Sequence, residues 1–411
     1  MKNIIFTTPV LEHPAAGGPQ LRIENSIKAL GRICNLYVIS QVSADQIGKK
    51  EDVNYLRSLC KKFTFIPSKS GWKYSRMIFI RIFRKMLRIL LPEMFSPEKD
   101  IDYIVKYVKE VSADILWFGF GNISFPLIQK LRERLPELKF VYDTDSVWSR
   151  FILRELDFES DPARRAKIQK DGDAKIIEER KSVELCEVTT AVSEIDAEYY
   201  RSICSKPEKV HIFSNVIDID TYNPPPSPPL SYKKPALFFG GSYGKKSPMS
   251  FAANWLIKEV MPLVWKKYPD IFVYLVGRGS DVSCDSLLSD RVIATGKMDS
   301  VLPYLCNACC AVVPLFFESG TRFKIMEAGA CNIPIVSTTL GAEGIPVIHE
   351  RDCLIADTPE NFANSILRLF EDKGLADKLS KNCHKLIKEN YSIDSLESEA
   401  IKIIDYLFSK E

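Results

Sequence analysis

The sequence predicts an α/β protein made of two doubly wound domains. Two stretches, which start at residues 2 and 235, follow the same order of apolar strand, glycine-containing loop, helix and strand. That order is typical of a parallel sheet with helices on both faces. The 411 residues are enough for two domains with a core each. With 46% hydrophobic and 27% charged residues, the composition is that of a globular protein.

A run of prolines divides the chain. Five of the six residues from 224 to 229 are proline, which cannot donate the backbone hydrogen bonds of a helix or strand. We therefore expect a first domain over residues 1–218, a linker over 219–234 and a second domain over 235–390. Apolar spacing predicts a final helix within residues 391–411.

The first domain is predicted to open with a strand at 2–7, a loop that contains Gly17 and Gly18, and a helix. The glycine pair is either a tight turn or a close approach of the backbone to a ligand. The remaining apolar runs predict strands at 36–40, 115–118, 140–142, 188–193 and 210–213. Asp143 and Asp145 follow one of these strands. They could bind a divalent ion, line a cleft or cap the loop, and we expect no metal.

Residues 73–91 differ from the rest of the chain because lysine and arginine alternate with large apolar residues and no acidic residue occurs. A basic amphipathic helix of this kind can lie on an anionic membrane surface. The alternative is a helix whose apolar side packs on the first domain. We predict peripheral contact with the inner face of the membrane.

Charge and cysteine content exclude several classes of protein. A formal net charge of +3 is too small for a nucleic-acid-binding protein, so no nucleic-acid partner is expected. We find no signal peptide and no apolar run near the ~20 residues of a transmembrane helix, which predicts a cytoplasmic protein. The 11 cysteines do not suggest a disulfide framework. Cys306 and Cys309 have the spacing of a metal or redox pair but are interpreted as core residues.

The most informative stretch is 312–346. An apolar run at 312–317 predicts a strand, and the turn Glu318-Ser319-Gly320-Thr321 opens a helix that carries Arg322, Lys324 and Glu327. Free amides at a helix start, beside two cations, suit a phosphate or diphosphate. The carboxylate of Glu327 could accept hydrogen bonds from the vicinal hydroxyls of a ribose. The alternative is an ordinary βαβ unit with a solvated helix.

Other loops of the second domain follow the carboxyl ends of predicted strands, where open α/β sheets bind ligands. One contains Gly241 and Lys245, another Gly277, and a third Lys297 and Met298. Lys245 could reach a diphosphate or be simply solvated.

These residues resemble the donor-site signature of glycosyltransferase family 4, whose members have the GT-B fold. The resemblance rests on Gly320-Thr321-Arg322-x-Lys324-x-x-Glu327-Ala328, on Pro334-x-Val336-Ser337-Thr338 and on Gly341-Ala342-Glu343-Gly344. It implies two Rossmann-like α/β domains that face each other across a cleft. It also implies that the final helix crosses back to the first domain.

The resemblance further implies a retaining enzyme that moves a sugar from a UDP- or GDP-linked donor to a hydroxyl acceptor, with no other cofactor. Glu327 would bind the ribose, Glu318 would face the donor sugar, and the loop of Lys297 and Met298 would hold the base. The loop of Gly17 and Gly18 would approach the donor or the acceptor, and Asp145 would contact the acceptor. The expected acceptor is a glycan or lipid-linked glycan in polysaccharide or cell-envelope synthesis.

Two other functions stay open. Met249, Val216 and Gly329 depart from the family pattern, so the chain could be a catalytically silent GT-B homologue that serves as a binding subunit. A sugar-nucleotide epimerase shares the fold. A nicotinamide-dependent dehydrogenase is disfavoured because no Gly-x-Gly-x-x-Gly follows the first strand.

Overall fold

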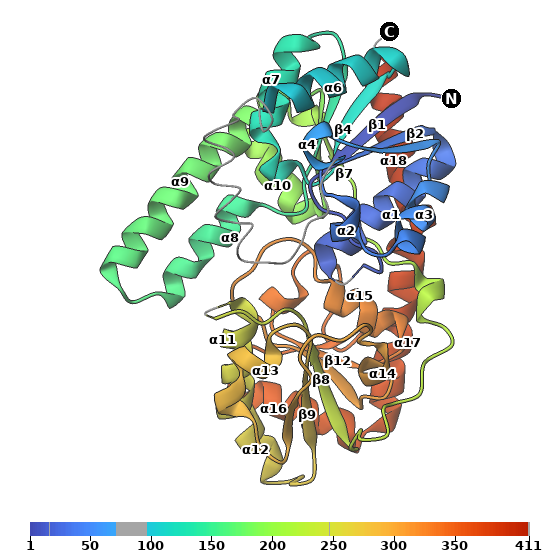
Figure 1. Cartoon of the computed structure of the whole chain (residues 1–411). Helices are drawn as coiled ribbons and strands as arrows, with labels where there is room; N and C mark the ends of the chain where they lie inside the picture. Colours follow the sequence, from blue (N-terminus) through green and yellow to red (C-terminus); the bar gives the residue numbers. More distant parts are fainter. Residues whose placement is uncertain (16, 71–96, 246, 410–411) are drawn as a thin grey trace, which may run out of the picture. The chain divides into compact units, whose positions relative to one another are not determined.

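The computed structural model describes residues 1–411 apart from 16, 71–96, 246 and 410–411 (Figure 1). The described residues form two compact units. The first unit holds residues 1–146, 173–214 and 396–411, and the second holds residues 147–172 and 215–395. The basic helix predicted at 73–91 lies outside the described residues. Within the described ranges, no helix is both long enough and apolar enough to span a membrane.

The first unit is built on a seven-stranded parallel sheet in the order β3-β2-β1-β4-β5-β6-β7. The strands are β1 (Asn3–Thr8), β2 (Asn35–Ser40), β3 (Lys62–Phe65), β4 (Ile115–Phe118), β5 (Lys139–Asp143), β6 (Val188–Ala191) and β7 (Val210–Ile212). The order reverses between β1 and β4, so the loops after these strands line the expected ligand crevice of this sheet.

Continuous apolar runs form the middle strands because helices cover both faces of the sheet. Ile4, Ile5 and Phe6 of β1 are fully buried, and β1 pairs in parallel with β2 from Asn3–Asn35 to Thr8–Ser40. The short helices of this unit are α2 (Ala44–Ile47), α3 (Lys50–Ser58), α4 (Pro67–Ser70), η2 (Gly121–Ile123) and η4 (Pro207–Lys209). The longer ones are α1 (Gly18–Ile33), α6 (Pro97–Glu110), α7 (Phe125–Arg134) and α10 (Glu194–Ile203).

The last helix, α18 (Ile393–Phe408), packs within the first unit from residue 396 onward. The carboxylate of Glu399 accepts hydrogen bonds from the backbone N–H of Ser214 at 2.7 Å and from its hydroxyl at 2.8 Å. Lys139 donates to the carbonyl of Leu407 at 2.6 Å. Apolar residues of α18 such as Leu396, Ala400 and Ile403 are buried, as the spacing predicts.

The second unit contains a six-stranded parallel sheet in the order β10-β9-β8-β11-β12-β13. Its strands are β8 (Ala236–Gly240), β9 (Phe272–Val276), β10 (Val292–Ala294), β11 (Cys310–Val313), β12 (Ile335–Ser337) and β13 (Leu354–Ile355). The order reverses between β8 and β11. Both units thus have the doubly wound topology of a Rossmann-like domain, and the predicted fold class is confirmed in each.

The strand predicted at 312–317 lies earlier in the structure, at Cys310–Val313. Pro314 has no N–H to donate to a neighbouring strand, which ends the pairing. Residues 314–322 therefore form a loop rather than a strand and a tight turn.

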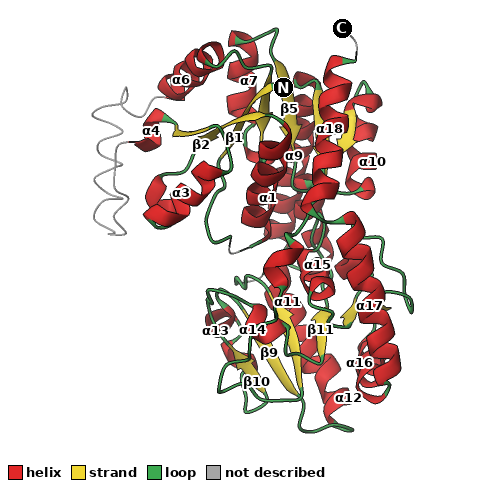
Figure 2. Ribbon diagram, turned by 90° about the vertical axis from the view of Figure 1, so that its right-hand side faces the viewer, coloured by secondary structure: helices red, strands yellow, loops and turns green. Residues whose placement is uncertain are grey.

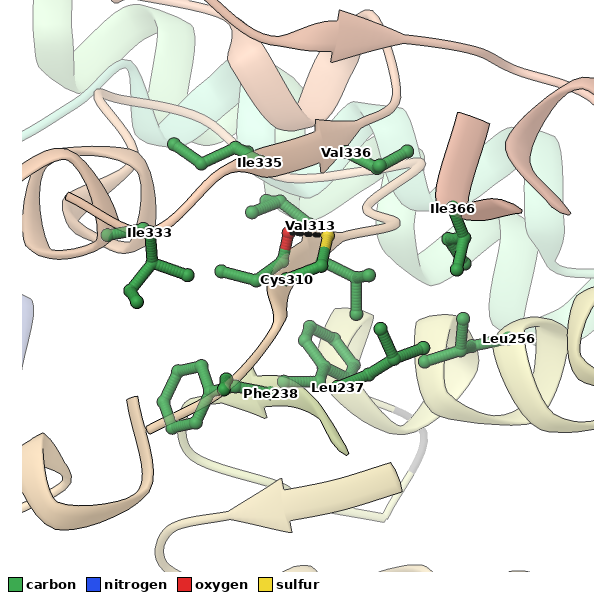
Figure 3. Packing of buried hydrophobic residues seen from close by; sticks show 14 of the residues in the cluster. Leu237, Phe238, Leu256, Cys310, Val313, Ile333, Ile335, Val336 and Ile366 are labelled. Atoms are coloured by element: carbon green, nitrogen blue, oxygen red, sulfur yellow. Dashed lines mark hydrogen bonds between the residues drawn. The ribbon is translucent and has the colours of Figure 1, made fainter. Parts of the chain in front are cut away.

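Helices cover both faces of the second sheet (Figure 2). They are α11 (Pro248–Trp255), the π-helical turn η6 (Leu256–Val260), α12 (Met261–Trp265), α13 (Ser280–Ser283), η7 (Asp285–Leu287), α14 (Leu302–Leu305), α15 (Phe323–Ala330), η8 (Leu340–Ala342), α16 (Pro359–Glu371) and α17 (Lys373–Asn390). Figure 3 shows the resulting core: Leu237 and Val313 from the sheet lie beside Leu256 of η6 and Ile366 of α16, all fully buried or nearly so.

A segment from the first half of the sequence also belongs to the second unit. Residues 147–172 include α8 (Trp148–Arg154), the turn η3 (Glu155–Phe158) and the start of α9 (Pro162–Leu185). The ring of Phe158 stacks on Phe317 at 5.0 Å and meets Phe251 edge-on at 5.0 Å. The sequence analysis assigned these residues to the first domain, predicted over residues 1–218. The short turn η5 (Ile219–Tyr222) follows the predicted domain end at 218.

Candidate functional site

The loop after β8 lies where the strand order of the second sheet reverses, between β8 and β11. The loop after β8 begins with Gly241, whose φ of +157° lies in the region that favours glycine. A Cβ at Gly241 would lie 2.7 Å from Cε of Met249 and 3.2 Å from Cε of Lys324. The stem of Lys324, on α15, therefore passes directly against the backbone of the glycine loop.

The loop after β9 adjoins the same place. The N–H of Gly241 donates to the carbonyl of Val276 at 2.9 Å, and a Cβ at Gly277 would lie 2.1 Å from the carbonyl oxygen of Gly241. Gly277 also has a positive φ, +125°. Only glycine fits here without moving backbone, so the structure brings together Gly241, Gly277 and Lys324, which the sequence analysis selected separately.

The loop 318–322 reaches the start of α15 and is tightly held. Gly320 has a φ of +79°. The hydroxyl of Thr321 accepts a 2.6 Å hydrogen bond from the amide of Asn215. The Oγ of Ser319 and the Oε2 of Glu318 are shielded from solvent and make no hydrogen bond with the described part of the chain. These two oxygens can still hydrogen-bond to a bound molecule.

Arg322 is buried, with 2% of its side chain exposed. Its Nη1 donates to the carbonyl of Gly320. Its Nε lies 3.8 Å from Oε2 of Glu318, and its Nη2 lies 4.0 Å from Oε1 of Glu343. Arg322 caps α15, which begins at Phe323. The amides of Ser319–Thr321 therefore precede the helix rather than forming its first turn.

Glu327 lies one turn farther along α15, beside Tyr222 of η5. The Tyr222 hydroxyl is 3.5 Å from Oε1 of Glu327. Burial raises the pKa of Glu327 to about 7, although the charge of Lys324 and the hydrogen bond from Tyr222 act in the opposite direction. A carboxyl group with this pKa gains or loses its proton near neutral pH.

The other predicted residues of this unit differ in exposure. Lys245 and Lys297 are exposed, and Met298 is half-buried against the core. Gly296, before Lys297, has a φ of +66° and donates its N–H to Ser280 at 3.0 Å. The loop of Lys297 and Met298 thus follows β10 at the edge strand of the sheet.

The predicted residues of the first unit lie at its own strand ends. Gly18 is the first residue of α1, and Gly17 is its extended N-cap. Asp145 is half-buried in the loop after β5, and its N–H donates to the amide oxygen of Asn122 at 3.0 Å.

Asp143 is committed to the core of the first unit. Its Oδ1 accepts from Arg22 and, at 2.7 Å, from Thr190, while its Oδ2 accepts from Trp117 at 3.0 Å. Arg22 is itself buried and also donates to the carbonyl of Phe213. Asp143 is a structural residue, whereas Asp145 remains the candidate for the acceptor side.

The two cysteines that were predicted to be core residues are not fully buried in the structure. Cys309 is exposed and Cys306 is half-buried. Cys306 lies with its Sγ 3.3 Å from the Sγ of Cys331, at the end of α15. No group of three or more potential metal ligands occurs among the described side chains.

The sequence analysis missed several residues that contact the predicted ones. Asn215 precedes the predicted linker, Tyr222 lies at its start, and Glu343 was noted only as part of a motif. Arg154, on α8, donates to both carboxylate oxygens of Glu343 at 2.7 Å. No local pattern distinguishes Arg154, because its partner lies 189 residues away.

Comparison with known proteins agrees with this geometry. Residues 234–372 match the family model described as glycosyl transferases group 1. This stretch is similar to the glycosyl transferases group 1 family. It contains β8 to β13 and every predicted donor-site residue of the second unit.

The solved structures that resemble the chain share its fold. Sucrose-phosphate synthase from Thermosynechococcus elongatus is 16% identical, with a TM-score of 0.69 over 100% of both chains. Alr3699/HepE from Anabaena, in complex with UDP and glucose, is 13% identical, with a TM-score of 0.65 over 98% of this chain and 100% of that chain. The chain has the GT-B fold, as predicted.

One curated relative was found by sequence, an uncharacterized 44.6 kDa protein in the cps region of Klebsiella pneumoniae. It is 24% identical over 157 residues, which cover 36% of this chain and 40% of that protein.

The three departures from the family pattern occupy packing positions. A Cβ at Gly329 would lie 2.8 Å from Cγ1 of Ile387 and 2.9 Å from Sγ of Cys383, so the small residue lets α15 approach α17. Met249 packs on Gly241, and Val216 is buried. Local packing therefore accounts for the glycine at position 329.

Proposed function

We propose that the protein is a retaining glycosyltransferase that moves a sugar from a nucleoside diphosphate to a hydroxyl acceptor. The observation that carries the proposal is the approach of Lys324 to Gly241, which places a cation against a glycine loop at the reversal point of the second sheet. Arg322 stands at the start of the same helix and Glu327 farther along it. The group 1 match covers all of these residues.

The chemistry needs stabilisation of the leaving diphosphate as its negative charge develops. Lys324 and Arg322 supply positive charge for this, and the free oxygens of Ser319 and Glu318 supply hydrogen-bond partners for the donor. Glu327, as a carboxylate, would accept hydrogen bonds from the ribose hydroxyls. In the retaining reaction of similar enzymes, the acceptor attacks from the face of the leaving group and the donor phosphate takes its proton.

The acceptor is expected to be a glycan or lipid-linked glycan bound by the first unit, with Asp145 as one contact. The basic sequence at 73–91 favours the lipid-linked form and peripheral contact with the inner face of a membrane. The donor is expected to be linked to UDP or GDP; the relative from Anabaena was solved with UDP and glucose.

A nucleotide panel tests the donor part. UDP, GDP and ADP would be titrated calorimetrically into the wild type, Glu327→Ala and the control Glu360→Ala, whose side chain is exposed on α16. We expect one nucleotide to bind the wild type and the control and to lose affinity in Glu327→Ala. If none binds, the donor-site proposal is wrong.

A turnover assay then distinguishes a glycosyltransferase from an epimerase and from a silent binding subunit. With the matching nucleotide sugar and a glycan or lipid-linked acceptor, a glycosyltransferase forms a product whose anomeric configuration, read by NMR, equals that of the donor. Inversion would refute the retaining reaction. Conversion of the donor into an isomeric nucleotide sugar without acceptor would identify an epimerase, and nucleotide binding with no turnover on an acceptor panel would favour the silent binding subunit.

A further inference from the structure

Arg154 lies outside the residues that match the group 1 family, yet it contacts the candidate donor site. It is the last residue of α8, in the segment 147–172 that packs within the second unit. Phe158 follows Arg154 closely in the sequence, and Phe317 directly precedes Glu318. The rings of these two phenylalanines stack, with centroids 5.0 Å apart. This apolar contact anchors the segment beside the loop 314–322.

The contacts of Arg154 are specific. Its Nη1 and Nη2 donate to Oε1 and Oε2 of Glu343, each at 2.7 Å. Its Nη1 also donates to the backbone carbonyl of Glu318. Paired hydrogen bonds between a guanidinium and a carboxylate are both strong and directional. The side chains are 24% and 18% exposed, so solvent screens the pair only partly.

Glu343 connects Arg154 to Arg322. Its Oε1 lies 4.0 Å from Nη2 of Arg322. Burial would raise the pKa of Glu343, but the hydrogen bonds and charge of Arg154, with the charges of Arg322 and Arg150, hold its pKa below the usual value. Glu343 is therefore a carboxylate at neutral pH, between two guanidinium groups that approach it from different parts of the chain.

We propose that Arg154 is a positioning residue of the donor site, which orients Arg322 and the loop 318–322 toward the diphosphate. It does so through Glu343, which holds the guanidinium of Arg322, and through the carbonyl of Glu318, which fixes the beginning of the loop. This inference rests on the proposed function, because it assigns Arg322 to the diphosphate. The domain that matches the family is then completed by a helix from the first half of the sequence.

The test compares Arg154→Gln with Arg164→Gln. Arg164 is a matched control because it pairs with Glu155 and Glu159, both within the same segment 147–172. We expect Arg154→Gln to weaken the binding of the nucleoside diphosphate about tenfold or more, while binding of the free nucleoside is unchanged. Arg154→Lys, which keeps the charge but not the paired geometry, should be intermediate.

A double-mutant cycle distinguishes positioning from direct contact. If Arg154 acts through Arg322, then adding Arg154→Gln to Arg322→Gln should cause little further loss of affinity for the nucleoside diphosphate. Independent losses that multiply would show that Arg154 does not act through Arg322 and would overturn the positioning role. Equal affinity of Arg154→Gln and Arg164→Gln would overturn it as well.

Hydrogen exchange in the free protein provides a measurement that does not depend on nucleotide. The amides of residues 318–322 should exchange faster in Arg154→Gln than in Arg164→Gln and the wild type, with equal exchange in the core strands. Unchanged exchange in this loop would refute the inference. If the wild type binds no nucleotide but the loop exchanges faster, the proposed function fails and the structural link from Arg154 to the loop stands.

Discussion

The hydroxyl of Tyr222 lies 3.5 Å from Oε1 of Glu327, so a residue at the start of the predicted linker contacts the helix that carries the candidate donor-site residues. Both groups lie in the second unit. Tyr222 is buried beside this carboxyl group. Two pH-dependent properties follow from this arrangement.

Replacing Glu327 by Gln should change how stability depends on pH. Burial raises the pKa of Glu327 from 4.5 to about 7, so the folded protein holds this proton between those values and the unfolded chain releases it. The contribution of the group to stability is complete below pH 4.5 and is lost as the pH rises to about 7. Relative to Glu327→Gln, the free energy of unfolding of the wild type should decrease by at most roughly 3 kcal/mol across this pH range.

Chemical denaturation of both proteins at pH 4.5, 5.5, 6.5 and 7.5 measures that difference. The free energy of unfolding of the variant, minus that of the wild type, should increase with pH. A difference that stays constant would show that Glu327 titrates at its ordinary pKa.

Nucleotide affinity should also rise with pH because of Glu327. A ribose hydroxyl donates to a carboxylate, so binding favours the deprotonated form and should release a proton near pH 6.5. Calorimetry in two buffers of different ionisation enthalpy measures this release. The nucleotide itself exchanges the same protons when it binds Glu327→Gln. The difference in proton release between the wild type and this variant therefore reports the titration of Glu327. Equal proton release by both would contradict the role of Glu327 as a hydrogen-bond acceptor.

Asp143→Asn should strongly destabilise the first unit. The substitution leaves the buried guanidinium of Arg22 without its carboxylate and disturbs the hydrogen bonds from Thr190 and Trp117. Breaking a buried ion pair of this kind costs about 3–5 kcal/mol. Asp102→Asn is the control, because Asp102 pairs with Arg134 at an exposed surface and its loss should cost about 1 kcal/mol or less. Similar free energies of unfolding for the two variants would show that the Arg22 pair contributes little.

Cys306 and Cys331 should form a disulfide when the protein is treated with diamide. Their sulfur atoms are 3.3 Å apart, and the hydrogen bond with Cys331 lowers the pKa of Cys306. Diamide takes up the two hydrogen atoms as the S–S bond forms. Peptide mapping without reductant should find the 306–331 cross-link, and Cys331→Ser should abolish it. A predominant link between Cys306 and the exposed Cys309 would show that sequence spacing, rather than the observed contact, governs the chemistry.

Many elements of the fold could be predicted because their signals are local. The runs at 36–40, 115–118 and 140–142 lie within β2, β4 and β5. The short edge strand β3 (Lys62–Phe65) escaped prediction because only Phe63 is buried in it, which leaves no apolar run. The end of β11 was placed too late because Leu315 and Phe317 are buried in a loop rather than in the sheet.

The candidate site was predictable to the extent that its residues share one segment. Gly320, Arg322, Lys324 and Glu327 form a recognisable pattern of turn and helix, and the glycines at 241 and 277 follow apolar strands. The contact between Tyr222 and Glu327 could not be predicted, because nothing in the sequence around Tyr222 indicates which distant residue it contacts. The commitment of Asp143 to Arg22 was equally invisible, since their separation of 121 residues is bridged only by folding.

By itself, the sequence determined the class of the protein: strand and helix periodicity, glycine loops and a proline run specify two α/β domains, because these signals act between near neighbours along the chain. The tertiary structure alone decided that residues 147–172 join the second unit and that Arg154 pairs with Glu343. It also decided that Gly329 serves the packing of α15 on α17. The physical reason is that burial, ion pairing and close packing depend on which distant residues the fold brings within a few ångströms.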